Sequence, residues 1–296
     1  MAFAKRKLPM TVGAEASGEI TKVGPGVTHL KVGDLVSIYG APTCGTCRPC
    51  REGQDNKCEH PAGVHGFHLD GYGQELSNMP ARNCIKAPVG VTDIGAALAP
   101  VTFGTVEHMF FDNAKLESGE TVLIHAGGSG IGSAAIQLAK KIGCNVITTV
   151  GSDDKIEKCL ELGADHVINY REDRFEGQVR KITKKKGVDV VFEHVGKDTW
   201  AGSMLSMRPG GRLVTCGSTS GVSAETNLMM LFQRQLRLIG SFGCRMQNIT
   251  DAMEKMAKGI VHPVVDSEVE FGDIQTALER MEARKVFGKI IMRVND

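Results

Sequence analysis

The sequence has 296 residues, 42% of them hydrophobic, a length that suits two domains or one large domain with an excursion. Its 35 Lys and Arg balance 34 Asp and Glu, so a formal net charge of +1 gives no overall attraction to nucleic acid or an anionic membrane. No stretch approaches the roughly eighteen consecutive apolar residues of a membrane span, and the basic start MAFAKRKLPM is not followed by an apolar run. We therefore expect a cytoplasmic protein that acts on a small molecule, with neither nucleic acid nor membrane as a partner.

Residues 11 to about 98 are predicted to form an antiparallel, loop-rich β domain. Gly, Pro and Asp separate short apolar runs there, as is typical of such domains. We expect its strands within the segments GEITKVGPGV (18–27), GDLVSIYG (33–40), YGQELSNMP (72–80) and NCIKAPVG (83–90).

Four of the nine cysteines lie within the fifteen residues CGTCRPCREGQDNKC, at Cys44, Cys47, Cys50 and Cys58. A disulfide is disfavoured in the cytosol, and the spacing does not match the bacterial iron–sulfur run. Four thiolates on a short loop suit zinc, and a Cys₄ shell leaves no open position for substrate or water. We predict a structural zinc. The other five cysteines are expected to be small buried hydrophobic residues.

From Thr121 onward, short β-branched runs alternate with segments of helical period, the pattern of a doubly wound parallel sheet. A helix is predicted over GIGSAAIQLAKKI, ending at Gly143. The six expected strands lie in TVLIHA (121–126), NVITTV (145–150), HVINY (166–170), VDVVFEHV (188–195), GRLVTCG (211–217) and LRLIGSF (236–242). The fold class is therefore α/β.

A strand, the turn GGSGIG and a helix follow one another at 121–142, the context that a dinucleotide fingerprint requires. The glycines allow a tight turn, and the helix N-terminus stabilises a pyrophosphate. Ser129 stands where the middle glycine of the fingerprint normally falls, and its small side chain still leaves room. The predicted contacts are Gly127, Ser129, Gly130, Ile131 and Gly132.

The second strand ends at Val150 and Gly151, without the acidic residue that normally binds an NAD ribose. Ser152, Lys155 and Tyr170 could instead hold a 2′-phosphate, which favours NADP(H) over NAD(H). In the alternative, Asp153 accepts from the ribose and Ser152 only caps a helix.

The segment MQNITDAMEKMAKGIV is predicted to form an amphipathic helix and VFGKIIMRV a final strand that returns to the β domain. We accordingly expect three parts: residues 1–101 with the zinc lobe, the dinucleotide-binding domain 102–246, and the C-terminal return 247–296.

Together these segments resemble the medium-chain dehydrogenase/reductase superfamily, the group of zinc alcohol dehydrogenases and quinone oxidoreductases. The similarity also includes VGAEASGEITKVGPGVTHLKVGDLVSI and DGYGQEL, and runs from about Leu8 to the last strand. The resemblance implies a GroES-like catalytic domain, a Rossmann domain, hydride transfer with NADP or NAD, and a homodimer or homotetramer.

Two departures from the family pattern concern catalytic zinc. Ala14, in Gly13-Ala14-Glu15, stands where zinc alcohol dehydrogenases have a histidine ligand, and Val101 stands where they have a cysteine. The third family ligand lies in an N-terminal part of the catalytic domain that we expect this chain to lack. We therefore predict chemistry without catalytic zinc.

By match to the family, further residues are expected at the cofactor. Thr105 would lie by the nicotinamide, and Lys289 would approach the pyrophosphate. Backbone at Gly217, Ser218, Ser241 and Phe242 would line the carboxamide side.

The glycine-rich segment GVHGFHLDGYG holds two candidates for the proton donor, His65 and His68, of which we assign His65. The alternative is that His65 and His68, with His60, decorate the surface of the zinc lobe. His108, His125 and His194 are expected to be packed or hydrogen-bonded.

Three functions remain open. The first is an NAD(P)H-dependent reductase of enones, quinones or aldehydes without catalytic zinc. The second is an NAD-dependent alcohol dehydrogenase, and the third is a non-catalytic, dimeric nucleotide-binding protein.

Overall fold

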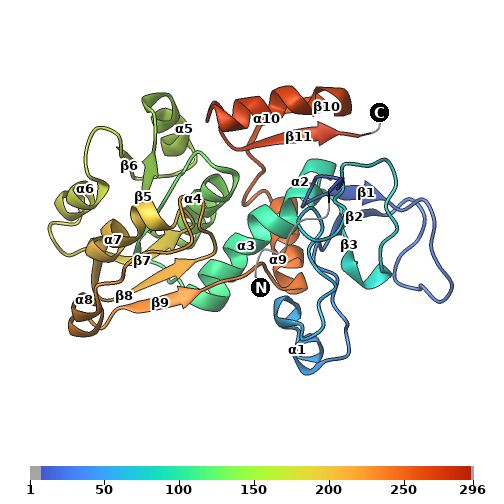
Figure 1. Ribbon diagram of the computed structural model, residues 1–296, viewed down its shortest axis with the longest axis horizontal. Coiled ribbons are helices and arrows are strands. Elements are labelled where there is room, and N and C mark those ends of the chain that lie inside the picture. The colour runs from blue at the N-terminus through green and yellow to red at the C-terminus, as the bar shows by residue number, and fades with distance from the viewer. Residues whose placement is uncertain (1–7, 295–296) are drawn as a thin grey trace. The chain divides into compact units, whose positions relative to one another are not determined.

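The computed structural model describes residues 8–294, which form two compact units that are treated separately (Figure 1). Unit 1 combines the residues up to Thr105 with those from Gly243 onward, and unit 2 comprises Val106–Phe242.

The first part of unit 1 is a small antiparallel sheet with long loops. Its strands β1 (Ser17–Glu19), β2 (Leu35–Ile38) and β3 (Cys84–Lys86) pair in the order β1-β2-β3. The loops contain the short helix α1 (Arg48–Arg51) and single helical turns η1 (Asp55–Lys57) and η2 (Ala81–Asn83). The predicted antiparallel, loop-rich character is confirmed.

The strand expected at 72–80 is wrong, because this segment is irregular. The Gly71 and Gly73 N–H groups donate to the Thr11 and Val12 carbonyls, at 2.8 Å each. A Cβ on Gly71 would lie 2.3 Å from the Gly13 oxygen, so the two backbones approach more closely than side chains allow. Close packing of glycine against backbone takes the place of the strand pairing expected here.

The C-terminal part of unit 1 contains the predicted helix, α9 (Met246–Ala257), and the predicted final strand, β11 (Lys289–Arg293). β11 pairs in parallel with β10 (Val265–Glu270), and the two are joined through the turn η6 (Phe271–Asp273) and helix α10 (Ile274–Glu282). The Arg293 guanidinium binds Glu268 across this pair and also Asp93.

Unit 2 is built on a six-stranded parallel sheet in the order β6-β5-β4-β7-β8-β9 (Figure 1). All six predicted strands are confirmed, and so is the doubly wound α/β class. The strand order reverses between β4 and β7, and ligands of such sheets bind where the strands' carboxyl ends meet this reversal. The strands are β4 (Thr121–Ile124), β5 (Asn145–Val150), β6 (His166–Asn169), β7 (Val188–Glu193), β8 (Met207–Thr215) and β9 (Arg237–Gly240).

Helix α4 (Gly130–Ile142) follows the glycine-rich turn and ends, as predicted, at Gly143, which adopts the left-handed conformation with φ of 96°. Residues 132–139 are all buried, so the helix is covered on every side over this stretch. The remaining helical elements of unit 2 are η4 (His108–Ala114), η5 (Asp153–Lys155), α5 (Ile156–Glu161), α6 (Phe175–Ile182), α7 (Lys197–Ser206) and α8 (Leu228–Gln233).

One helical segment of the described residues, Asp93–Ala114, is long and apolar enough to cross a membrane by composition. It comprises α2 (Asp93–Leu98), the π-helical turn η3 (Ala99–Phe103), α3 (Gly104–Glu107) and η4. Of its most apolar window, 78% is buried inside the protein. That burial is typical of a core helix.

Candidate functional site

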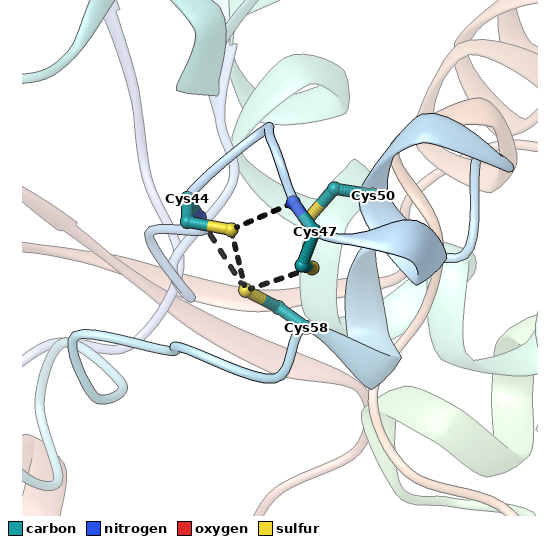
Figure 2. Close-up of side chains that lie close together, drawn as sticks. All are labelled: Cys44, Cys47, Cys50 and Cys58. Atoms are coloured by element: carbon teal, nitrogen blue, oxygen red, sulfur yellow. Dashed lines mark hydrogen bonds between the residues drawn. The ribbon is translucent and has the colours of Figure 1, made fainter.

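The four clustered cysteines converge in unit 1 (Figure 2). Their sulfurs all lie within 4.8 Å of one another, and the Cys58 sulfur is 3.6 Å from that of Cys44 and 4.0 Å from that of Cys47. A tetrahedral zinc with Zn–S bonds of about 2.3 Å requires sulfurs about 3.8 Å apart. The measured distances bracket this value, so the sulfurs fit zinc.

Backbone N–H groups also surround these sulfurs. The Cys47 N–H donates to the Cys44 sulfur, and the Cys44 and His60 N–H groups donate to the Cys58 sulfur, each at 3.4 Å. Such donors stabilise thiolates, and bonds from Cys47 and Thr46 lower the pKa of Cys44 to about 5. All nine cysteines are free of disulfides. Of the other five, Cys144, Cys159 and Cys244 are buried as expected, while Cys84 and Cys216 are only partly buried.

The loop that carries the cysteines is anchored within unit 1. Asp55, which lies between Cys50 and Cys58, accepts from the backbone N–H of Met246 at the start of α9, at 3.3 Å. The Arg82 guanidinium covers Gly45, where any Cβ would collide with it, and donates to the Thr43 hydroxyl at 3.0 Å. A filled Cys₄ site in this position holds a loop in shape.

The glycine-rich turn of unit 2 connects β4 to α4 in very little space. A Cβ on Gly127 would lie 2.4 Å from the Thr148 hydroxyl, and one on Gly132 would lie 2.2 Å from the Ala126 carbonyl oxygen. Ser129 caps α4, because its hydroxyl accepts from the Gly132 N–H at 3.0 Å. The Gly130 and Ile131 N–H groups in the first helical turn lack an intrahelical acceptor, as a pyrophosphate site requires.

At the carboxyl end of β5, the Tyr170 ring lies directly over Gly151. A Cβ at Gly151 would be 2.6 Å from the Tyr170 hydroxyl. Ser152 is adjacent, and its hydroxyl hydrogen-bonds Asp154, which lowers the pKa of that carboxyl. Ser152 makes no side-chain cap on the turn η5. Ser152 and Tyr170 therefore both lie at the carboxyl end of β5, and Lys155 follows Ser152 by three residues.

Asp153, the alternative ribose ligand, is already engaged. Its carboxylate accepts from the Asn169 side-chain amide at 2.8 Å. Binding a ribose hydroxyl would require this carboxylate to share its oxygens with that bond.

The residues expected near the carboxamide lie at the carboxyl ends of the last strands. A Cβ on Gly217 would be 2.7 Å from the His194 oxygen, and one on Gly196 would be 2.9 Å from the Ser218 Cα, so these loops touch. Ser241 follows β9 and accepts from the Asn113 amide at 3.0 Å. Phe242 is 61% exposed. Thr105 and Lys289 belong to unit 1, and their contact with a dinucleotide stays a prediction.

Glu15 and Thr102, the sequence neighbours of Ala14 and Val101, contact each other. Glu15, next to Ala14, accepts from the Thr102 N–H at 3.0 Å and from the Thr102 hydroxyl at 3.1 Å, and it forms an ion pair with Lys289. Thr102 is the neighbour of Val101. Among the described residues, the four cysteines are the only group of three or more His, Cys, Asp or Glu side chains whose ligand atoms converge.

His65 is half-buried and stacks on the Tyr72 ring, with centroids 5.0 Å apart. Its Nδ1 lies 2.5 Å from the Asp70 carbonyl oxygen. Because a carbonyl only accepts, Nδ1 carries a proton, and Nε2 of the neutral ring is the basic nitrogen.

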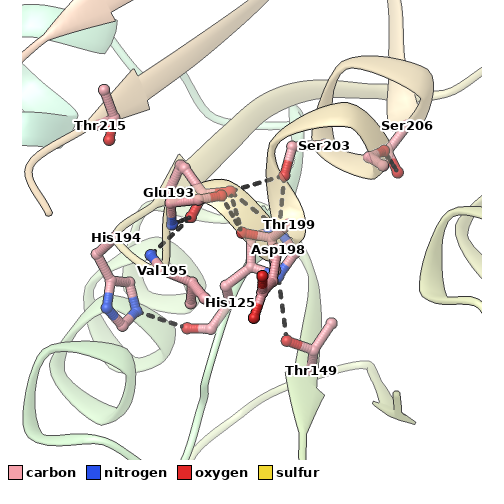
Figure 3. Close-up of polar contacts among 12 residues, drawn as sticks. His125, Thr149, Glu193, His194, Val195, Asp198, Thr199, Ser203, Ser206 and Thr215 are labelled. Atoms are coloured by element: carbon pink, nitrogen blue, oxygen red, sulfur yellow. Dashed lines mark hydrogen bonds and ion pairs between the residues drawn. The ribbon is translucent and has the colours of Figure 1, made fainter. Parts of the chain in front are cut away.

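Unit 2 also contains a buried polar cluster that was not predicted from the sequence, formed by Thr149, His125, Ser203 and Glu193 (Figure 3). His125 and His194 are buried or partly buried and hydrogen-bonded, as expected. The sequence signal for this cluster is a polar side chain at the end of each of two apolar strands, His125 in LIHA and Glu193 in VFEH. The hydrogen-bond partners of these two side chains lie on other elements and could not be identified from spacing.

Comparison with known proteins agrees with both units. Residues 1–89 match the alcohol dehydrogenase GroES-like domain, and residues 130–258 match the zinc-binding dehydrogenase family. The chain is 30% identical over 292 residues to an acryloyl-coenzyme A reductase of Metallosphaera sedula, covering 98% of this chain and 85% of that protein. It is 31% identical over 297 residues to a quinone oxidoreductase of Salmonella typhimurium, covering 96% and 82%.

Among solved structures, an NAD-dependent alcohol dehydrogenase superposes with a TM-score of 0.91 and 34% identity, covering 98% of this chain and 84% of that one. The resemblance inferred from the motifs is therefore confirmed. With the Rossmann sheet, the glycine-rich turn and the GroES-like match all in place, the chain belongs to the medium-chain dehydrogenase/reductase superfamily of NAD(P)-dependent enzymes.

Proposed function

We propose that this enzyme is an NADP(H)-dependent reductase that acts on an activated carbon–carbon or carbonyl bond, as in an enone, quinone or aldehyde, without catalytic zinc. The observation that carries the proposal is the environment of Glu15. The two neighbouring family ligand positions hold Ala14 and Val101, and the carboxylate itself is engaged by Thr102 and Lys289. Alanine and valine cannot ligate zinc, and one engaged carboxylate is a poor site. The names of the reductase relatives, acryloyl-coenzyme A reductase and quinone oxidoreductase, agree with such acceptors.

In the bound state, the nicotinamide supplies the hydride, and one further proton completes the reduction. The chain's own residues bind and orient the two reactants. Gly127, Gly130 and Gly132 admit the pyrophosphate to the N-terminus of α4, where helix N–H groups stabilise its charge. Ser152, Lys155 and Tyr170 bind the 2′-phosphate of NADP(H).

His65 is the proposed proton donor. Its Nδ1–H is held by the Asp70 carbonyl, so proton transfer takes place at Nε2. Replacing His65 by Gln, which cannot pass on a proton at this position, is expected to lower kcat with little change in KM. An unchanged kcat would instead place His65 among the surface residues of the zinc lobe.

A second candidate function is an NAD-dependent alcohol dehydrogenase, which the similarity to a solved enzyme of that name favours. Steady-state turnover of a small panel, an enone, a quinone, an aldehyde and an alcohol, distinguishes the two. We expect enone or quinone reduction with NADPH to exceed alcohol oxidation with NAD. A clear preference for alcohol plus NAD would select the dehydrogenase. Tight NADPH binding without turnover of any acceptor would indicate a non-catalytic protein.

We also propose that the protein is a cytoplasmic homodimer or homotetramer. Nine disulfide-free cysteines suit a reducing compartment. Strand β9 forms one edge of the Rossmann sheet, and Leu228, Met229 and Phe232 of the preceding helix α8 are each more than half exposed. An open edge and exposed apolar side chains suit pairing of two copies. Light scattering of the purified protein measures the oligomeric state.

A further inference from the structure

Four buried polar side chains form a continuous hydrogen-bonded chain in unit 2, which we call the buried relay: Thr149, His125, Ser203 and Glu193 (Figure 3). They come from β5, the end of β4, α7 and the end of β7. Their exposed fractions are 2%, 1%, 0% and 0%. Burying such groups is unfavourable unless every one is paired, and here each one is.

Glu193 is the acceptor at one end of the relay. Its Oε1 accepts from the Val195 and Gly196 N–H groups, at 2.7 and 3.1 Å, and its Oε2 accepts from the Thr199 and Ser203 hydroxyls, each at 2.8 Å. Burial alone would raise the pKa of Glu193, but the hydrogen bonds from these donors oppose that effect, and the pKa lies below its ordinary value. Glu193 is therefore an ionised carboxylate that only accepts.

The direction of the remaining bonds follows. Because Ser203 gives its proton to Glu193, its oxygen accepts from His125 Nε2, at 2.8 Å. Burial lowers the pKa of His125 to about 4, so the ring is neutral and Nδ1 is an acceptor. The Thr149 hydroxyl, 3.2 Å from Nδ1, then donates to it and in turn accepts from the Ala126 N–H at 3.1 Å. The donor and the acceptor of each bond in the chain are thereby assigned.

At its two ends, the relay binds backbone N–H groups of two loops of the proposed cofactor site, the glycine-rich turn after β4 and the loop after β7. Ala126 opens the glycine-rich turn with φ of 50°, a left-handed conformation that alanine seldom adopts. At the other end, Glu193 holds Val195 and Gly196, and the Val195 carbonyl accepts from the Ser220 N–H at 2.7 Å. One chain of bonds thus connects the pyrophosphate turn with the loops that follow β7 and β8.

We propose that the buried relay positions the dinucleotide site, because it holds the glycine-rich turn, through Ala126, and the loop after β7, through Glu193, in one mutually fixed arrangement. The four relay residues are positioning residues and contact no substrate. The inference rests on dinucleotide binding by unit 2 and is independent of the zinc-free chemistry proposed above.

Ser203→Ala tests the relay, and Ser206→Ala is its matched control. Ser206 lies on the same helix, is also buried, and donates to the Gly202 carbonyl instead of to the relay. We expect S203A to raise the Kd for NADPH about fivefold, the change that corresponds to one hydrogen bond of about 1 kcal/mol. S206A should leave Kd within about twofold of the wild type, within the scatter of single contacts.

A double-mutant cycle separates positioning from general destabilisation. Thr149→Val removes the other half of the relay, whereas Thr149→Ser keeps the hydroxyl and should bind NADPH as the wild type does. We expect T149V and S203A to be non-additive in Kd, because either change alone interrupts the same chain. Urea unfolding of each variant verifies that it is folded.

The imidazole provides a spectroscopic readout. Nitrogen-15 NMR should find His125 as the Nε2–H tautomer in the wild type and in S206A, and a changed tautomer balance in S203A. Equal Kd values for S203A and S206A, or additive effects of T149V and S203A, would overturn the inference while leaving the reductase function in place. A wild-type protein that binds no dinucleotide would overturn both.

Discussion

Gly132→Ala is expected to disable the cofactor site while the protein still folds. A Cβ at this position would lie 2.2 Å from the Ala126 carbonyl oxygen and 2.9 Å from the Gly127 Cα, and both atoms belong to backbone. For the new Cβ to reach an ordinary van der Waals distance from this oxygen, the turn must move away from α4 by roughly 1 Å. A misplacement of that size lowers activity on the order of 100-fold. Overpacking of this kind destabilises a fold by about 1 to 3 kcal/mol.

Gly177→Ala is the control. Gly177 lies in α6 of the same unit, and a Cβ there meets nothing within 4 Å. Alanine should stabilise that helix by up to about 1 kcal/mol. The assay is a fluorescence titration with NADPH beside a urea unfolding curve for each variant. Wild-type affinity in a folded G132A protein would refute the placement of the pyrophosphate at this turn.

Three further changes test other parts of the molecule. Cys47→Ser removes one of four zinc ligands, so we expect loss of bound zinc and a lower Tm. The fraction that stays folded should retain turnover. Loss of turnover in a fully folded, NADPH-binding variant would show a catalytic metal instead. Lys155→Ala should raise KM for NADPH at least about tenfold and leave KM for NADH nearly unchanged, since only the former carries a 2′-phosphate; equal changes in both values would argue against this site. Asp266→Asn should make the stability of the fold less sensitive to acid. Burial alone would raise the pKa of Asp266, but hydrogen bonds from the Phe287 N–H and Arg280 hold the pKa below its ordinary value. The stabilisation by the Asp266 carboxylate is therefore complete above the unfolded pKa of about 4 and is lost as the pH falls through the lower folded pKa. Urea unfolding at pH 7 and pH 3 measures this difference, and an unchanged pH dependence in the variant would contradict it.

The elements that could be predicted are those whose signals are local. Each Rossmann strand is a short β-branched run between breakers, and α4 has both its glycine-rich start and Gly143 at its end. The zinc site could be predicted for a similar reason, since all four ligands lie within one loop, where spacing alone brings them together.

The features that were missed depend on packing between distant segments. The punctuation by Gly and Pro at 72–80 is compatible with a short strand, but the Gly71 and Gly73 N–H groups donate to the Thr11 and Val12 carbonyls instead. In the buried relay, His125 and Ser203 are 78 residues apart, and nothing in either segment specifies the other. Polar side chains at the ends of apolar strands are the only sequence signal for such a network, and it identifies the positions without their partners.

Hydride transfer without a catalytic metal can be tested on a single preparation. Zinc content and NADPH-dependent turnover of an enone or quinone are measured before and after mild chelation. We predict about one zinc per chain, held by the four cysteines, and turnover that chelation leaves unchanged while this zinc remains bound. Loss of turnover on chelation, with fold and NADPH binding intact and with recovery on adding zinc, would instead show a catalytic metal.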